Sequence, residues 1–145
     1  MPTSEQTVRS DTGLASELRL SVMRLRRRLA GQRHPDNPLS MGAMAVLGAL
    51  YRNGDLTVGE LAAHERVQPP SMTRMVNALS EAGYVERRAN PRDGRQVVVS
   101  LSEVGRRTLL ADRARRDEWL ARLSPDERDA LRRAAPILQR LANED

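Results

Sequence analysis

The N-terminal part of the chain carries one stripe of apolar residues at helical spacing. From residue 14 to residue 29 they recur every three or four positions, which predicts an amphipathic helix that ends near Gly31. The stripe consists of Leu14, Leu18, Val22, Leu25 and Leu29. Pro35 and Pro38 follow and disfavour helical geometry at the residues before them. Residues 1–11 show no periodicity, and we expect them to form a disordered tail.

A shorter segment from Met41 to Tyr51 is apolar almost throughout. Ser40 before it is a favourable N-cap, and the dipeptide Asn53-Gly54 after it is typical of a helix end. A helix that is apolar on nearly every side must be surrounded by other elements. We therefore predict that this helix forms the centre of the core.

The next segment predicts two short helices joined by a tight turn. Thr57 and Glu60 have the spacing of a capping box, directly before an apolar pair. Val67 and Gln68 form the turn, and Pro69 suits the first position of the second helix, where a missing N–H does no harm. Helices joined by so short a turn must cross steeply, as in a helix-turn-helix.

The second of these helices, residues 69–82, has two different faces. Met72, Met75, Val76 and Leu79 share one face, which should pack on the core. The opposite face and its flanks carry Pro70, Ser71, Thr73, Arg74, Asn77 and Glu81. Hydroxyl, amide and guanidinium groups bind phosphates and base edges in a major groove. The alternative is an ordinary amphipathic helix with its polar face in water.

The segment after Gly83 predicts a basic β-hairpin. Residues 84–88 and 96–101 alternate like strands, and residues 89–95 connect them. Arg92 and Arg95 lie in the connection and Arg87 and Arg88 at its base, so an anionic partner is needed to offset their repulsion. We expect Asp93 to brace the Arg95 guanidinium, as suits an arginine that enters an electronegative minor groove.

Two further helices are predicted in the C-terminal third. Ser102 is an N-cap for a helix to Leu123, and Ser124, Pro125 and Glu127 begin another. The last helix has an apolar side that includes Leu131, Ile137, Leu138 and Leu141. One small module cannot cover this stripe and the N-terminal one together. Pairing with a second copy would bury both, so we expect a homodimer.

Composition narrows the function. The 145 residues suffice for one domain, and an aromatic content of 2% favours helices over a β-sandwich or barrel. The net charge is +5, and all 24 basic residues are arginine. Arginine suits phosphate and guanine recognition, but a genome rich in G and C would also favour its codons. The positions of the arginines, and not their total, must decide between these alternatives.

Several classes of function do not fit this sequence. The absence of cysteine removes disulfides, thiolate metal sites and thiol catalysis. His34 and His64 stand apart from any acidic motif, and no glycine-rich phosphate loop is present, so we expect neither an enzyme nor a metal site or cofactor. The sequence shows no secretory signal and no apolar run of membrane-spanning length, which predicts a cytoplasmic protein.

Together, the motifs between residues 56 and 107 resemble those of the MarR family of bacterial winged helix-turn-helix transcription regulators. The matching positions are Val67, Pro69, Ser71, Thr73, Arg74, Leu79, Gly83, Arg87, Asp93, Arg95 and the run from Leu101 to Gly105. The resemblance implies a mainly α fold with a small antiparallel β-wing. It also implies one domain over residues 12–145, with a DNA-binding module at 39–101 and a helical dimerisation region at 12–34 and 102–145.

The resemblance implies a homodimer that binds double-stranded DNA at a pseudo-palindromic operator. The DNA-binding positions carried over are Ser71, Thr73, Arg74, Asn77, Asp93 and Arg95, and the charge of the loop adds Arg92. Our hypothesis is a repressor that responds to a small-molecule effector of unknown identity. The alternative is a winged-helix module that binds proteins, or nucleic acid without sequence preference, and has no effector.

Overall fold

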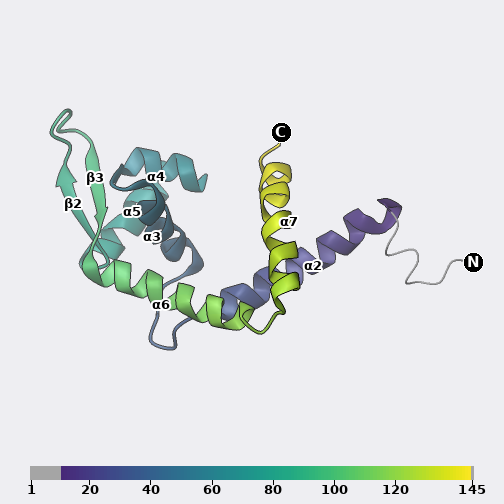
Figure 1. Ribbon diagram of the computed structural model, residues 1–145. Helices are drawn as coiled ribbons and strands as arrows, with labels where there is room; N and C mark the ends of the chain where they lie inside the picture. The colour runs from purple at the N-terminus through teal and green to yellow at the C-terminus, as the bar shows by residue number, and fades with distance from the viewer. Residues whose placement is uncertain (1–10, 145) are drawn as a thin grey trace, which may run out of the picture.

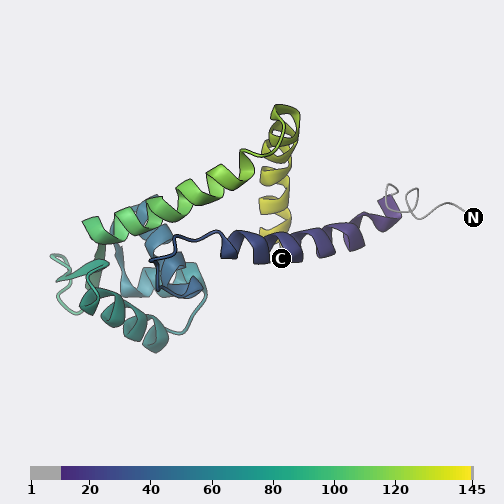
Figure 2. The ribbon, with the colours of Figure 1, turned by 90° about the horizontal axis from the view of Figure 1, so that it is seen from below.

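The computed structural model describes residues 11–144, and in these the chain forms a compact body with two projecting helices. The body contains α3 (Met41–Asn53), α4 (Val58–Glu65), α5 (Pro69–Glu81) and a three-stranded sheet. Helix α6 (Glu103–Leu120) leads away from it, and α2 (Asp11–Gly31) and α7 (Pro125–Asn143) lie at its far end. Figure 1 and the turned view in Figure 2 both show this separation.

The sheet consists of β1 (Leu56–Thr57), β2 (Val85–Ala89) and β3 (Val97–Leu101), all antiparallel and in the order β1-β3-β2. The hairpin of β2 and β3 was predicted to within one residue at each strand. Strand β1 was not predicted, because its two residues are defined only by their pairing with Val98 and Val99, far away in sequence. The mainly helical fold with a small antiparallel wing is confirmed.

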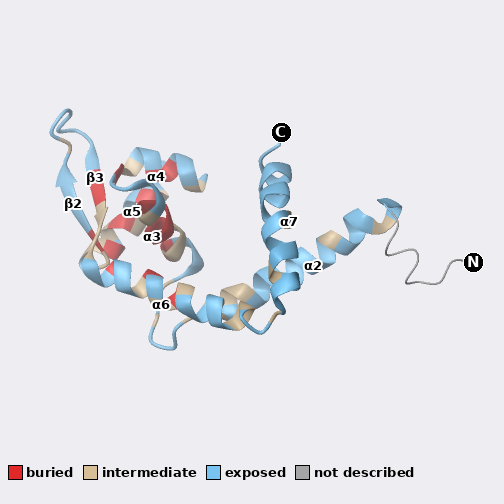
Figure 3. Cartoon of the chain, viewed as in Figure 1, coloured by how far each residue is buried: buried red, intermediate tan, exposed pale blue. Residues whose placement is uncertain are grey.

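The core lies around α3, as predicted. Val46 and Leu47 are fully buried, and Leu61 of α4, Met72 of α5 and Val99 of β3 close around them. Figure 3 shows that the buried residues gather in the body and in the near half of α6, whereas α2 and α7 are exposed or half-buried. Neither of these two helices contains a buried residue.

Local hydrogen bonds set the helix ends largely as the sequence predicts. Thr57 and Ser124 each form a complete capping box, and Ser40 and Ser102 cap α3 and α6. The backbone N–H of Ser124 donates to the Glu127 carboxylate at 3.0 Å, and with the Ser124 side chain it lowers the pKa of Glu127.

Several predicted helix boundaries differ from the structure, including the end of α5, which lies at Glu81 and not at residue 82. Helix α6 ends at Leu120 and not at Leu123, and α2 begins at Asp11, the last residue of the predicted tail. An acidic residue in the first turn interacts favourably with the helix dipole, so Asp11 suits a helix start. The remainder of the predicted tail, residues 1–10, lies outside the described residues.

Candidate nucleic-acid interface

Helix α5 presents a polar face to solvent because its apolar face is fixed in the core. Met72, Val76 and Leu79 are at most 3% exposed. Pro69 occupies the first turn, and Gly83 with φ of 86° follows the helix end. On the outer side lie four of the predicted DNA-binding residues: Ser71, Thr73, Arg74 and Asn77.

Hydrogen bonds within α5 already orient part of this face. The Arg74 guanidinium donates to the Ser71 hydroxyl at 3.2 Å. The Thr73 hydroxyl donates to the carbonyl of Pro69, one turn earlier, at 3.0 Å. Each hydroxyl keeps lone pairs for a further donor, and Arg74 keeps most of its five N–H groups. The structure therefore brings these three side chains together on the exposed first half of the helix.

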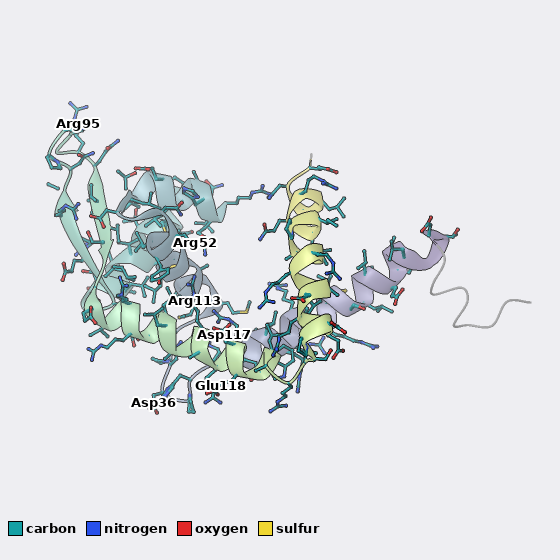
Figure 4. All side chains as sticks on the ribbon, viewed as in Figure 1. Asp36, Arg52, Arg95, Arg113, Asp117 and Glu118 are labelled. Carbon is teal, nitrogen blue, oxygen red and sulfur yellow. The ribbon has the colours of Figure 1, made fainter. Side chains whose placement is uncertain are left out.

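The wing ends in a turn that local hydrogen bonds stabilise, and this turn carries Arg92 and Arg95. Asn90 and Gln96 pair across its base through their side-chain amides at 2.8 Å and through a backbone hydrogen bond at 3.0 Å. The side-chain oxygen of Asn90 also accepts from the backbone N–H of Arg92 at 3.0 Å. Arg95 lies at the tip of the hairpin and points away from the body (Figure 4).

The predicted brace between Asp93 and the Arg95 guanidinium is wrong. The Asp93 carboxylate accepts instead from the backbone N–H of Arg95, at 3.1 Å, and no ion pair joins the two side chains in the described part of the chain. An aspartate two residues before an N–H is well placed to close an Asx turn, and that geometry directs the carboxylate to the backbone. Asp93 thus fixes the loop and leaves the guanidinium free to turn.

The two arginines at the base of the wing have intramolecular partners that the sequence did not indicate. The Arg87 guanidinium donates to the side-chain oxygen of Asn77 on α5. The Arg88 guanidinium forms an ion pair with Asp55 at 2.7 Å and also donates to Ser100. Alternation along β2 explains the difference, since neighbouring residues point to opposite faces of a sheet. Only Arg87 faces α5.

A groove of about 430 Å³ separates α5 from the wing. Thr73 and Asn77 line it from α5, Arg87 and Arg95 from the wing, and Thr57 from the start of α4. The lining residues thus include two arginines, two amides and two threonines, and no carboxylate is among them. Such a donor-rich, positively charged surface suits a polyanion with regularly spaced oxygens.

A second pocket, of about 460 Å³, lies where α2, α3 and α6 meet. Its apolar wall includes Val22, Leu25, Leu29, Met41 and Met44. Its polar groups are Arg26, Arg33, Arg116 and Asp112. The sequence did not identify this pocket, because its residues come from three separate segments of the chain.

Asp112 is the one buried charged residue in the part of the chain that the structure describes, with 1% of its surface exposed. Its carboxylate accepts from the backbone N–H of His34 and from the side-chain amide of Asn37, both at 2.8 Å. The Arg33 Nε lies 3.7 Å away. These contacts attach the segment between α2 and α3 to the middle of α6.

Residues 11–144 show neither a membrane span nor a metal cluster. No helix in this range is long and apolar enough to cross a membrane. No group of three or more His, Asp or Glu side chains in the same residues has the arrangement of a metal site.

Comparison with known proteins agrees with this geometry. The sequence profile of the MarR family matches residues 39–97, which span α3 to the start of β3. An uncharacterized HTH-type transcriptional regulator of Mycobacterium bovis is 47% identical over 139 residues, covering 93% of this chain and 96% of the relative. HTH abbreviates helix-turn-helix.

Solved structures show the same fold. A transcriptional regulator from Pseudomonas aeruginosa aligns with a TM-score of 0.76 at 39% identity, over 99% of this chain and all of the other. BpsR of Bordetella bronchiseptica aligns with a TM-score of 0.65 at 19% identity, over 88% of this chain and 99% of that one. The DNA binding of BpsR is regulated by 6-hydroxynicotinic acid.

Proposed function

The chain belongs to the MarR family of DNA-binding transcription regulators, and on that premise we propose that it is a homodimeric repressor of a pseudo-palindromic operator, controlled by a small-molecule effector. Members of this family are not enzymes. The observation that carries the proposal is the pairing of an exposed polar helix, α5, with an arginine-tipped hairpin on one surface of the body. We propose that it acts in the cytoplasm, where it has access to the chromosome.

The two parts of the surface match the two grooves of duplex DNA. Helix α5 has the width of a major-groove element, and Ser71, Thr73, Arg74 and Asn77 occupy its exposed face. The wing tip brings Arg92 and Arg95 beyond the body on a turn fixed by Asp93, which suits the narrow and electronegative minor groove. We propose all seven as the DNA-binding residues.

The exposed apolar surface of α2 and α7 supports the proposed dimer. Leu14, Leu25, Ile137 and Leu141 are each between 42% and 52% exposed in the single chain. A folded monomer rarely leaves two such helices uncovered. A twofold partner would cover them and would place a second α5 about one helical turn, roughly 34 Å, along the DNA.

The pocket between α2, α3 and α6 is the proposed effector site. It lies between the helices assigned to the dimer and the DNA-binding body, so a bound molecule would change their relative position. Its apolar wall and three arginines favour a small organic acid with an apolar body. The regulation of BpsR, which shares the fold, is consistent with such an effector. A dimer on promoter DNA would repress by blocking polymerase.

Selection of bound fragments from the organism's own DNA tests the proposal. The purified protein should enrich a pseudo-palindromic duplex, and shift assays should give much weaker binding to a single strand of the same sequence. Equal affinity for single and double strands, or for selected and scrambled duplexes, would favour the alternative of a non-specific nucleic-acid-binding module. No enrichment at all would favour a protein-interaction module.

Addition of small organic acids then tests the effector. We expect an active compound to weaken operator binding by the parent protein and to lose this effect when Arg116 is replaced with alanine. Operator binding that no compound of this class changes would count against ligand control.

A further inference from the structure

The groove between α5 and the wing contains an arginine that the set of proposed DNA-binding residues does not include. Arg87 shares its face of β2 with Val85, which is buried against the core, so its side chain extends over α5. There its guanidinium donates to the side-chain oxygen of Asn77. Both residues line the groove, together with Arg95 and Thr73.

The contact with Arg87 changes what Asn77 can do. An asparagine that recognises adenine needs its oxygen to accept from the base and its amide nitrogen to donate to it. In this structure the side-chain oxygen of Asn77 accepts from the Arg87 guanidinium, and this hydrogen bond fixes the orientation of the amide. Asn77 is therefore placed to orient the guanidinium of Arg87, and its oxygen keeps one lone pair for a further donor.

The position of the groove indicates what Arg87 would meet. The sugar-phosphate backbone separates the major groove of a duplex from its minor groove. If α5 enters the major groove and the wing enters the adjacent minor groove, one strand of the sugar-phosphate backbone must pass between α5 and the wing. The space between them is this groove, where the N–H groups of Arg87 that Asn77 does not use remain available.

We propose that the groove binds one phosphate of the DNA backbone, with Arg87 as the contacting residue and Asn77 as the residue that positions it. The proposal rests on the proposed function, because it needs α5 and the wing to be in adjacent grooves. A phosphate held here fixes the angle of the body on the duplex in every complex, whatever the base sequence.

Single and double replacements test this with duplexes from the selection and with a scrambled duplex. Arg87→Ala should weaken binding to both duplexes by a similar factor, roughly tenfold or more. The slope of log K against log salt is negative, and its magnitude should decrease by about 0.9 for each protomer. Asn77→Ala should also weaken DNA binding without changing the base preference. The double variant should bind DNA no more weakly than Arg87→Ala alone.

Arg88→Ala is the matched control, since it removes the same charge from the next residue of β2. Arg88 faces the other side of the sheet and is paired with Asp55. We expect it to change affinity by no more than about twofold and to leave the salt slope unchanged. Thermal unfolding of each variant would show that the wing remains folded.

Distinct outcomes would overturn the proposal. If Asn77→Ala shifts the preferred base at one operator position and keeps the parent salt slope, Asn77 contacts a base. If Arg87→Ala keeps the parent slope while the parent binds its operator, the groove holds no phosphate but the proposed function stands. If the parent protein binds no duplex at all, both fail together.

Discussion

Arg74 is the residue best placed to distinguish one base from another. It lies on the exposed face of α5, and its hydrogen bond to Ser71 limits the rotamers that it can adopt. A guanidinium in this position can make the bidentate contact with guanine. Of the α5 residues proposed to contact DNA, it has the longest reach beyond the helix.

Replacement of Arg74 with alanine should therefore reduce affinity for the selected operator by about 1 to 3 kcal/mol. It should reduce affinity for a scrambled duplex less, because base contacts are lost only in the specific complex. Competition binding with single-base operator variants measures both effects. A variant that keeps the parent sequence preference would show that Arg74 contacts only the backbone.

Arg95 is expected to act through charge and not through sequence recognition. The Asp93 carboxylate holds its backbone, and its side chain extends from the wing tip. Arg95→Ala should weaken binding and lower the salt slope by about 0.9 for each protomer if the side chain neutralises one phosphate. Titration at several salt concentrations tests this, and a slope equal to that of the parent would contradict a contact by the wing.

At the scale of elements, Asp112 connects three parts of the chain. Its buried carboxylate holds the backbone of His34, the amide of Asn37 and the guanidinium of Arg33. Removal of the carboxylate takes the acceptor from two partly buried hydrogen bonds and the ionic partner from Arg33. We expect Asp112→Ala to lower the free energy of unfolding by roughly 2 to 4 kcal/mol, because two hydrogen bonds to a buried, charged acceptor are lost.

Urea unfolding measures this effect, with Asp117→Asn as the control. Asp117 lies on the same helix but is exposed, so its replacement should stay within about 0.5 kcal/mol of the parent. The free energy of unfolding of Asp112→Asn should lie between those of Asp112→Ala and Asp117→Asn. The new side chain keeps an oxygen that can accept from the backbone N–H of His34, but it presents an NH₂ group to the side-chain amide of Asn37. Equal stability of Asp112→Ala and Asp117→Asn would show that the hydrogen bonds of Asp112 contribute nothing net.

The sequence predicts those elements that depend only on residues close to one another along the chain. The capping boxes at Thr57 and Ser124 need only residues three apart, and the apolar face of α5 follows from its period. Asp112 is different, because its neighbours along α6 are charged and its partners come from the segment after α2. The contact between Arg87 and Asn77 likewise depends on how the wing folds back over α5. Such long-range contacts leave no spacing that a sequence pattern could detect.

At the scale of the whole molecule, the arrangement of the arms argues for assembly. The core of the body is closed without α2 or α7, since neither helix contributes a buried residue. Most of α2 and all of α7 extend beyond the body at the far end of α6, as Figures 1 and 2 show, and only the C-terminal half of α2 approaches α3. The exposed apolar residues of the two helices contribute little to the core of the single chain, and in the proposed dimer a second copy would bury them. In a twofold dimer each such contact occurs twice.

A charge within the apolar side of α7 should therefore separate the dimer without unfolding the body. Ile137 is 47% exposed in the single chain, so Ile137→Arg should cost the monomer little. In the dimer it would bury two unpaired charges and raise the dissociation constant by roughly a hundredfold or more. Gln139→Arg introduces the same charge on the opposite side of the helix and should leave the dimer intact.

Light scattering during size-exclusion chromatography measures the mass of each variant, and operator binding measures the consequence. A monomer with an intact body presents one α5 and one wing, so Ile137→Arg should bind a full operator no better than a half-site. The parent and Gln139→Arg should prefer the full operator and should lose that preference when the half-sites are moved half a helical turn apart. An Ile137→Arg protein that remains dimeric at the parent's concentrations would place the interface elsewhere than on α7.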